Sequence, residues 1–379
     1  MGGIKEFKIF AVSQDPVYIG TGGYTIGRVD NTIVRDPITK IPKIPASSLA
    51  GTWRYYLALK LQGIYQNRFA DIKRVLDSNN IRNEDNVKDL VNRLADQESD
   101  NNNRLDIFKL YAAKIKNELN NNKNEEWQYY WGNLISSIKC AGQDDRPNDA
   151  LEKAYELRKL DDTGHCGHCI ICKSFGYSKH DESRQGRVFF SDLNILFFPV
   201  STRFGVRWIT SPGLLKQAGL EKGNYKELSE DAIIVTNKAK EERFLNLGWL
   251  NLKIKDEFDF VKLEKLITEI KQILKGKIVL ASDSIVSQII NANLEVRTSV
   301  SIDPLTGAAK GGALFTSEAI PRSTIFFGSI RIADRLNEGE DLTSELIENA
   351  LKDSVAYYQT LGLGGLVTRG YGRVNMFLE

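Results

Sequence analysis

The chain has 379 residues, enough for two or three domains or for one domain with a large insertion. Hydrophobic residues make up 42% and charged residues 26%, which excludes wholesale disorder. The net charge of +2 excludes a polycation that coats nucleic acid over its whole surface, so any nucleic-acid surface must be local. The opening MGGIKEFKIFAVSQD carries charges among its apolar residues, and we therefore expect no signal peptide and no membrane anchor.

The first sixty residues predict a strand, a loop and a helix. Residues 6–20 alternate polar and apolar side chains, as a strand does, and glycines follow them. The next stretch is held extended by Pro42 and Pro45. Ser47 or Ser48 is then a natural N-cap for a helix whose apolar residues recur at helical spacing.

The remainder of the chain mixes both types of element. Residues 62–160 read as amphipathic helical pieces joined by Asn-rich connectors. Two strands and a Ser-Pro helix start are expected between GRVFFSD and ITSPGLL. We expect a helix over 256–274, a strand-rich run over 278–332, and a helix over 344–361 before a last strand. Because no regular βαβ repeat occurs, an α+β fold is predicted.

A metal site is predicted where three cysteines crowd into one loop. Cys166, Cys169 and Cys172 are spaced Cys-x-x-Cys-x-x-Cys, close enough for three thiolates to bind one tetrahedral zinc ion. The candidates for the fourth ligand are Cys140, His165 and His168. Four protein ligands would make the zinc structural, and clustered thiols suit a reducing compartment, so we expect a cytoplasmic protein.

Two stretches suit phosphate binding. Ser47, Ser48 and Arg54 lie at the expected helix start, where backbone amides favour anions. The C-terminal GLGGLVTRGYGRV places Thr368 and Arg369 among five glycines, whose backbone can approach a phosphate closely. A capped helix and a set of tight turns are the structural alternatives. The basic residues near the helix start, which favour a polyanion, are Arg28, Arg35, Lys40 and Lys43.

Asp30 is the candidate catalytic group. It stands in YTIGRVDNTIVRD, between a Gly-rich turn and an extended stretch. Neither a Gly-x-Ser-x-Gly elbow nor a His-Glu-x-x-His helix occurs in the sequence. Taken by itself, an Asp before Asn is more often a turn residue than a catalytic one.

Four stretches together resemble the RAMP superfamily of CRISPR proteins and, more narrowly, the backbone subunit of the type III-B (Cmr) effector complex. They are GTGGYTIGRVDNTIVRDPITKIPKIPASSLAGTWR, ILFFPVSTRFGVRWITSPGLL, SIDPLTGAAKGGALFTSEAIPRSTIFFG and GLGGLVTRGYGRV. CIICKSFG is similar to the zinc loop of type III backbone subunits. The resemblance covers both ends and the centre of the chain, outside the helical insertion.

The resemblance implies a ferredoxin-like, RRM-type palm that carries a β-hairpin thumb. The expected parts are a first palm segment at 1–61, a helical insertion at 62–160, a zinc-binding loop at 161–185, and a second palm segment at 186–379 with the thumb hairpin at about 295–320. Two departures from the family stand out. Ala50 replaces a lysine that relatives often have, and the insertion is larger than usual.

The resemblance also implies a function, namely binding a guide crRNA and cutting complementary target RNA at six-nucleotide intervals, with Mg²⁺ or a similar divalent ion. Asp30 matches the aspartate that the family needs for cleavage. The implied RNA-binding residues are Arg28, Ser47, Ser48, Arg54, Thr368 and Arg369, and the zinc ligands are Cys140, Cys166, Cys169 and Cys172. The implied partners are copies of the chain and other subunits of the complex. The alternatives are a type III-A (Csm) backbone subunit or a RAMP-fold RNA-binding scaffold without catalysis.

Overall fold

The computed structural model describes residues 3–22, 29–60, 140–142, 165, 170–178, 183–220, 228–237, 243–257, 266–334 and 343–379. These separate into two compact units. The first comprises Met1–Glu6, Ala50–Phe190 and Ile330–Val355, and the second comprises Phe7–Leu49, Ser191–Ser329 and Ala356–Glu379. The helical insertion expected at 62–160 lies outside the described residues, except for 140–142.

The main sheet of the second unit follows the strand order β15-β1-β14-β6-β7-β11-β8-β10-β9. Its strands are β1 (Ile4–Ser13), β6 (Leu193–Thr202), β7 (Gly205–Thr210), β8 (Ala232–Val235), β9 (Phe244–Leu247), β10 (Leu250–Glu257), β11 (Ile278–Leu280), β14 (Ile325–Ala333) and β15 (Val374–Leu378). The short β2 (Lys43–Ile44) pairs with β6. Within the first unit, β5 (Val188–Phe190) pairs with residues 330–332 of β14.

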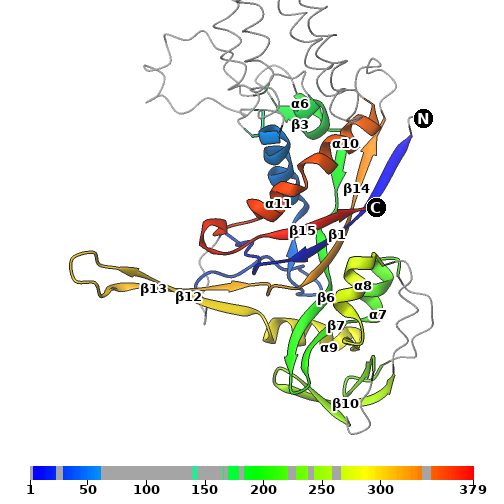
Figure 1. Ribbon diagram of the computed structural model, residues 1–379, viewed down its shortest axis with the longest axis vertical. Helices are drawn as coiled ribbons and strands as arrows, with labels where there is room; N and C mark the ends of the chain where they lie inside the picture. The colour runs from blue at the N-terminus through cyan, green and yellow to red at the C-terminus, as the bar shows by residue number, and fades with distance from the viewer. Residues whose placement is uncertain are drawn as a thin grey trace, which may run out of the picture. The chain divides into compact units, whose positions relative to one another are not determined.

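Four of these strands form a ferredoxin-like arrangement (Figure 1). With the elements between them set aside, the chain order is β1, a helix over residues 46–60, β6, β14, α10 (Ser344–Ser354) and β15, which is a β-α-β-β-α-β succession. The spatial order is β15-β1-β14-β6, and both β1–β15 and β14–β6 are antiparallel. The predicted α+β fold is therefore confirmed.

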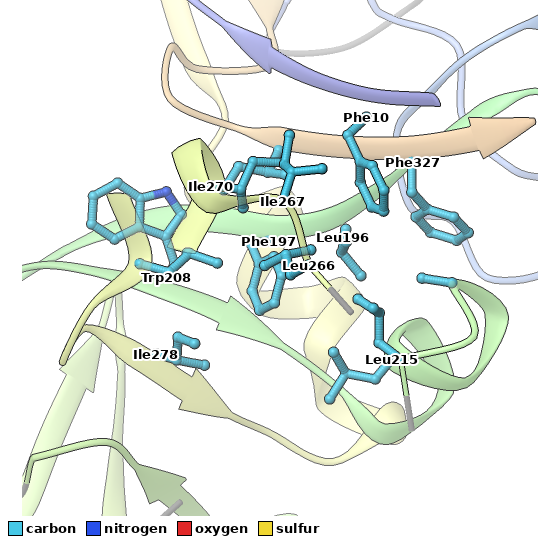
Figure 2. Packing of buried hydrophobic residues seen from close by; sticks show 14 of the residues in the cluster. Phe10, Leu196, Phe197, Trp208, Leu215, Leu266, Ile267, Ile270, Ile278 and Phe327 are labelled. Atoms are coloured by element: carbon cyan, nitrogen blue, oxygen red, sulfur yellow. The ribbon is translucent and has the colours of Figure 1, made fainter. Parts of the chain in front are cut away.

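The hydrophobic core of the second unit lies between this sheet and two short helices (Figure 2). Leu196 and Phe197 of β6 pack with Leu215 of α7 (Pro212–Gln217) and Ile270 of α8 (Thr268–Leu274). Ser211 caps α7, because its side chain accepts a hydrogen bond from the Leu214 amide at 3.4 Å. The predicted Ser-Pro helix start is confirmed.

Two helix predictions were wrong in part. The helix expected from residue 256 does not begin there, because Asp256 and Glu257 belong to β10, and α8 begins at Thr268. Conversely, α9 (Asp283–Ala292) occupies a run that was predicted to be strand-rich. Its buried residues are Ile285, Val286, Ile289 and Ile290, a helical spacing that is masked by their β-branched character. The last helix, expected over 344–361, is divided at Val355 into α10 and α11 (Ala356–Thr360).

A two-stranded hairpin, β12 (Glu295–Ile302) and β13 (Ala309–Ala319), forms a sheet of its own. Figure 1 shows it as a long ribbon. Thr298 lies opposite Thr316, and Val300 lies opposite Leu314. Val300 is 45% exposed and Leu314 is 65% exposed, so apolar side chains line the ribbon without being buried by the chain.

The first unit is built around the part of the helix over 46–60 that falls within it. Trp53 is fully buried, and its indole nitrogen donates to the Leu351 carbonyl at 3.2 Å and to Ser354 Oγ at 2.9 Å. The unit also contains α6 (Ile170–Phe175), β3 (Gly176–Ser178) and β4 (Ser183–Gln185). Among the described residues, no helix has both the length and the apolar character needed to cross a membrane.

Candidate active site at Asp30

The segment that carries Asp30 lies along the inner end of β13. The Asn31 amide donates to the Thr316 carbonyl at 3.0 Å, and the Glu318 amide donates to the Asn31 carbonyl at 3.0 Å. Asn31 Nδ2 also donates to Ser317 Oγ at 3.2 Å. These bonds extend the pairing of β13 by one short bridge, so Asp30 is fixed to the base of the hairpin.

The Asp30 carboxylate is held by Thr316. Asp30 Oδ2 accepts from the Thr316 amide at 2.8 Å and from Thr316 Oγ1 at 3.0 Å, and the Asp30 amide donates to the same Oγ1 at 3.1 Å. The hydrogen bond from the Thr316 amide, followed by that from its hydroxyl, lowers the pKa of Asp30 below the ordinary value of 3.8. The exposed carboxylate is therefore ionised at neutral pH.

The hairpin places apolar side chains next to this carboxylate. Residues directly opposite each other in an antiparallel pair point to the same face, and so do residues two positions apart along one strand. Thr316 therefore shares a face of the ribbon with Leu314 and with Val300, the partner of Leu314. One step of two residues corresponds to about 7 Å along a strand. Asp30 is thus anchored at the inner end of an exposed apolar face.

Arg35, one of the basic residues predicted to favour a polyanion, is engaged within the fold. Its guanidinium lies 2.6 Å from Glu318 Oε1 and donates from Nε to Asn291 Oδ1 at 2.9 Å. It also donates to the Ile33 carbonyl at 2.9 Å. Arg35 therefore holds the Asp30 segment against β13 and α9.

The helix start differs from the prediction. The helix begins at Ala46, so Ser47 and Ser48 lie in its first turn and the N-cap prediction was wrong. The capping acceptor comes from a distant residue, because Asp192 Oδ1 accepts from the Ala46 amide at 2.7 Å. Asp192 Oδ2 also lies 2.7 Å from Lys43 Nζ. This hydrogen bond to Asp192, more than any other contact, raises the pKa of Lys43.

An anionic side chain thus occupies part of the predicted phosphate seat. Of the two serines, Ser47 is exposed and Ser48 is half-buried. Fewer backbone amides are available for a phosphate at this helix start than the sequence predicted, because the Ala46 amide already donates to Asp192.

Arg54 contacts the predicted zinc loop. Arg54 Nε donates to the Cys140 carbonyl at 2.6 Å, and Nη2 lies 2.9 Å from His165 Nδ1. Because a guanidinium only donates, His165 Nδ1 is the acceptor of this bond. The half-buried Arg54 therefore ties the first helix to Cys140 and His165.

Three candidate zinc ligands lie buried in the first unit. Cys140, His165 and Cys172 are each no more than 1% exposed, and Cys172 Sγ lies 3.9 Å from His165 Nδ1. A tetrahedral zinc with Zn–S of about 2.3 Å and Zn–N of about 2.0–2.1 Å separates its sulfur and nitrogen ligands by about 3.6 Å. The Cys172–His165 spacing is close to this value, but the one lone pair of Nδ1 already accepts from Arg54, so in this arrangement it is not offered to zinc. Cys166, Cys169 and His168 lie outside the described residues.

Two glycines of the C-terminal loop are required by its turns. Gly364 and Gly372 have φ of +87° and +86°, where a side chain would be strained. The Gly372 amide donates to the Pro16 carbonyl at 2.8 Å, which attaches the loop to the chain following β1. Thr368 and Arg369 lie exposed in the short 3₁₀ helix η2 (Val367–Arg369). The loop thus presents these two side chains to solvent.

The structure also identifies residues that sequence reasoning missed. Thr316 binds Asp30, although 286 residues separate them in the chain. Arg297 of β12 stacks over the Tyr371 ring, with its guanidinium carbon 4.8 Å from the ring centroid, and so joins the hairpin base to the C-terminal loop. No local spacing in the sequence signals either contact. Arg28, the other predicted RNA-binding residue of this region, lies outside the described residues.

The strand order and the ribbon at its side define a ferredoxin-like protein with a projecting hairpin that carries a carboxylate at its base. The family model described as the RAMP superfamily matches residues 13–375. The chain therefore belongs to the RAMP superfamily, and the predicted membership is confirmed.

The individual relatives share little sequence identity with this chain. The curated protein "CRISPR system Cmr endoribonuclease Cmr4" of Pyrococcus furiosus is 26% identical over 225 residues, which cover 54% of this chain and 75% of the relative. The solved structure "Type III-B Cmr-beta Cryo-EM structure of the Apo state" is 14% identical, with 98% of this chain and 96% of that chain covered and a TM-score of 0.49. "Crystal structure of oligomeric Cmr4 from Pyrococcus furiosus" is 17% identical, with 99% of each chain covered and a TM-score of 0.47.

Proposed function

We propose that this chain is the guide-RNA-binding backbone subunit of a type III-B (Cmr) CRISPR effector complex and that it cuts complementary target RNA at six-nucleotide intervals. Its partners would be the crRNA, the target RNA, further copies of itself and the other subunits, in the cytoplasm. RAMP membership and the likeness to a relative named a Cmr endoribonuclease support this proposal. The observation that carries it is the attachment of Asp30 to the base of the hairpin.

The hairpin suits the part of a wedge between paired strands. In this proposal the target is recognised by pairing with the guide, so the protein needs no base-reading groove. Val300 and Leu314 lie opposite each other and are exposed, and they offer apolar contact to a base that has left its stack. An unstacked nucleotide next to them would place its backbone near Thr316 and Asp30.

Cleavage would proceed through the ribose of the displaced nucleotide. Its 2′-hydroxyl would lose its proton to water, and the 2′-oxygen would form a bond to the adjacent phosphorus while the bond to the 5′-oxygen of the next nucleotide breaks. That 5′-oxygen would take up a proton from water, which leaves a cyclic phosphate and a 5′-hydroxyl. Asp30 is ionised at neutral pH, and the bonds from Thr316 lower its pKa further, which does not favour proton uptake. Its constant negative charge favours a role in binding a cation over a role in proton transfer.

A magnesium ion fits this single carboxylate. Mg²⁺ usually keeps several waters and binds through one or two carboxylates and the phosphates of the substrate. The part of the chain that the structure describes contains no group of three or more His, Cys, Asp or Glu side chains that could hold a metal ion. Asp30 would supply a protein ligand, and water and RNA would supply others. When bound, the ion would neutralise charge on the phosphate.

The proposed RNA contacts of the chain differ in accessibility. Thr368 and Arg369 are exposed and suit contact with guide phosphates, and Ser47 is exposed at the first turn of the helix. Arg54 would act on the RNA only indirectly, by holding Cys140 and His165. For Arg28, RNA binding stays a prediction from the family resemblance.

We also propose a structural zinc ion bound by Cys166, Cys169 and Cys172 with Cys140 or a histidine. The burial of Cys140 and Cys172 supports it. Metal analysis of the purified chain should give about one zinc per chain, and less than about 0.2 would contradict the proposal. Unchanged zinc in Cys140→Ser would assign the fourth position to a histidine, while Cys172→Ser should lose the metal.

The nuclease assignment is tested with Asp30→Ala in the fully assembled, guide-loaded complex. Wild type should give regularly spaced products from an end-labelled target, and the variant should give none while binding the target normally. If regularly spaced cuts persisted in Asp30→Ala, the assignment of cleavage to Asp30 would be contradicted, and the chain would be assigned as an RNA-binding scaffold. Cleavage by wild type in excess EDTA would contradict the role of a divalent ion but not that of Asp30.

A further inference from the structure

Thr316 makes three hydrogen bonds with one residue. Its amide and its hydroxyl both donate to Asp30 Oδ2, at 2.8 and 3.0 Å, and the hydroxyl oxygen accepts from the Asp30 amide at 3.1 Å. The hydroxyl therefore fixes both the backbone and the carboxylate of Asp30. Any other β-branched residue would keep the strand but would leave only the bond from the amide.

Thr316 also sets the distance between Asp30 and the apolar face of the hairpin. It lies in β13 two residues from Leu314 and on the same face, and Asn31 binds the next residue, Ser317. The carboxylate therefore keeps its position relative to this face, whatever the orientation of the hairpin. A nucleotide unstacked against Leu314 would meet a carboxylate at a constant separation.

We propose that Thr316 is a positioning residue for the cleavage reaction, whose hydroxyl holds the Asp30 carboxylate in register with the apolar face of the hairpin. The inference rests on the proposed function, since it presumes that Asp30 takes part in cutting RNA. Thr316 would act through Asp30 and would contribute little to binding of the target. Its effect should therefore appear in the rate of the chemical step.

The experiment compares Thr316→Val with Thr316→Ser in the assembled, guide-loaded complex. Valine has the shape of threonine without the hydroxyl, and serine keeps the hydroxyl. With complex in excess over an end-labelled target, Thr316→Val should cut about tenfold more slowly, because small misplacements of a reacting group are costly. Thr316→Ser should cut within about threefold of wild type, and the Kd for target should change by less than about twofold in both.

Two further variants make the outcome decisive. Thr360→Val makes the same chemical change at an exposed threonine of α11 and should cut as wild type does. Asp30→Ala reports on the proposed function itself. If Asp30→Ala abolishes cutting and Thr316→Val cuts at the wild-type rate, or if Thr316→Ser is as slow as Thr316→Val, the positioning role is overturned while the nuclease assignment stands. If Thr316→Val does not assemble, Thr316→Ala takes its place with the same expectation.

Discussion

Asp30 and Asp192 are two carboxylates that the fold uses in opposite ways. Asp192 lies between the Lys43 ammonium and the Ala46 amide at the start of a helix, both of which favour its negative charge. Asp30 is held by an uncharged amide and an uncharged hydroxyl of Thr316. The charge of Asp192 thus lies against an ammonium, whereas the two bonds from Thr316 to Asp30 come from uncharged groups.

The same contrast separates two arginines. Arg54 binds the Cys140 carbonyl and the His165 ring, while Arg369 lies exposed in η2. Both were predicted to bind RNA from the family resemblance, and each stands in a stretch that suits phosphate, at a helix start or in a Gly-rich loop. What distinguishes them is whether acceptors from distant parts of the chain already engage the charge. A charged residue is a better candidate for a ligand site when the fold orients it but does not neutralise it.

The largest expected effect is the difference between Asp30→Asn and Asp192→Asn. Both changes remove one negative charge and keep the shape of the side chain. Asp30→Asn should lower the single-turnover rate of target cleavage by about 100-fold or more, because an amide is a poor ligand for Mg²⁺. Asp192→Asn should leave the rate within about twofold. Equal losses in the two variants would break the comparison.

Asp192→Ala should act on stability instead. It removes the acceptor for the Ala46 amide and the partner of Lys43, and we expect a loss of about 1–2 kcal/mol in the free energy of unfolding. The exposed Asp30→Ala provides the matched control and should cost less. Thermal unfolding of the two purified variants measures the difference. A lower Tm for Asp30→Ala than for Asp192→Ala would contradict it.

Arg369→Ala should weaken binding of the guide by about three- to tenfold and reduce the salt dependence of binding by about one phosphate contact. Arg54→Ala should leave this salt dependence unchanged, because its guanidinium is engaged by Cys140 and His165. Affinities measured at several salt concentrations separate the two variants. A change of slope in Arg54→Ala would show that its charge reaches the RNA.

The smallest effect concerns the titration of Asp30. The hydrogen bonds from Thr316 lower the pKa of Asp30 in the folded state. Their contribution to the stability of the folded chain is fully present above the pKa of the unfolded state. It is lost as the pH falls through the lower pKa of the folded state. A carboxyl NMR titration should place the midpoint below 3.8 in wild type and closer to 3.8 in Thr316→Val. An unchanged midpoint in the variant would mean that the amide alone causes the shift.

Local signals in the sequence predicted much of the fold. Ser211 before Pro212 predicted the start of α7, and the alternation of polar and apolar residues after residue 6 predicted β1. The secondary-structure prediction was wrong where residue type and residue spacing indicated different elements. Ile285, Val286, Ile289 and Ile290 have strand propensity but helical spacing, and the spacing determined the structure of α9.

The candidate site was predictable only in part. The family resemblance singled out Asp30, but the partner that orients it lies 286 residues away. The capping acceptor for the first helix also lies far along the chain, at Asp192, so Ser47 and Ser48 were the natural but mistaken choice. Hydrogen bonds between residues far apart in the chain produce no local sequence pattern. Each partner stands in the same local sequence whether or not the other is present.

The hairpin of β12 and β13 has a consequence for how this protein can vary. Among the described residues of the ribbon beyond Val300 and Leu314, none is buried, so no core contact of theirs fixes its length or composition. Asp30 and Asn31, by contrast, fix the register at its base through Thr316 and Ser317. Insertion or deletion of matched residue pairs beyond Val300 and Leu314 would leave the base untouched. The length of the outer hairpin can thus vary while the position of Asp30 at its base stays the same.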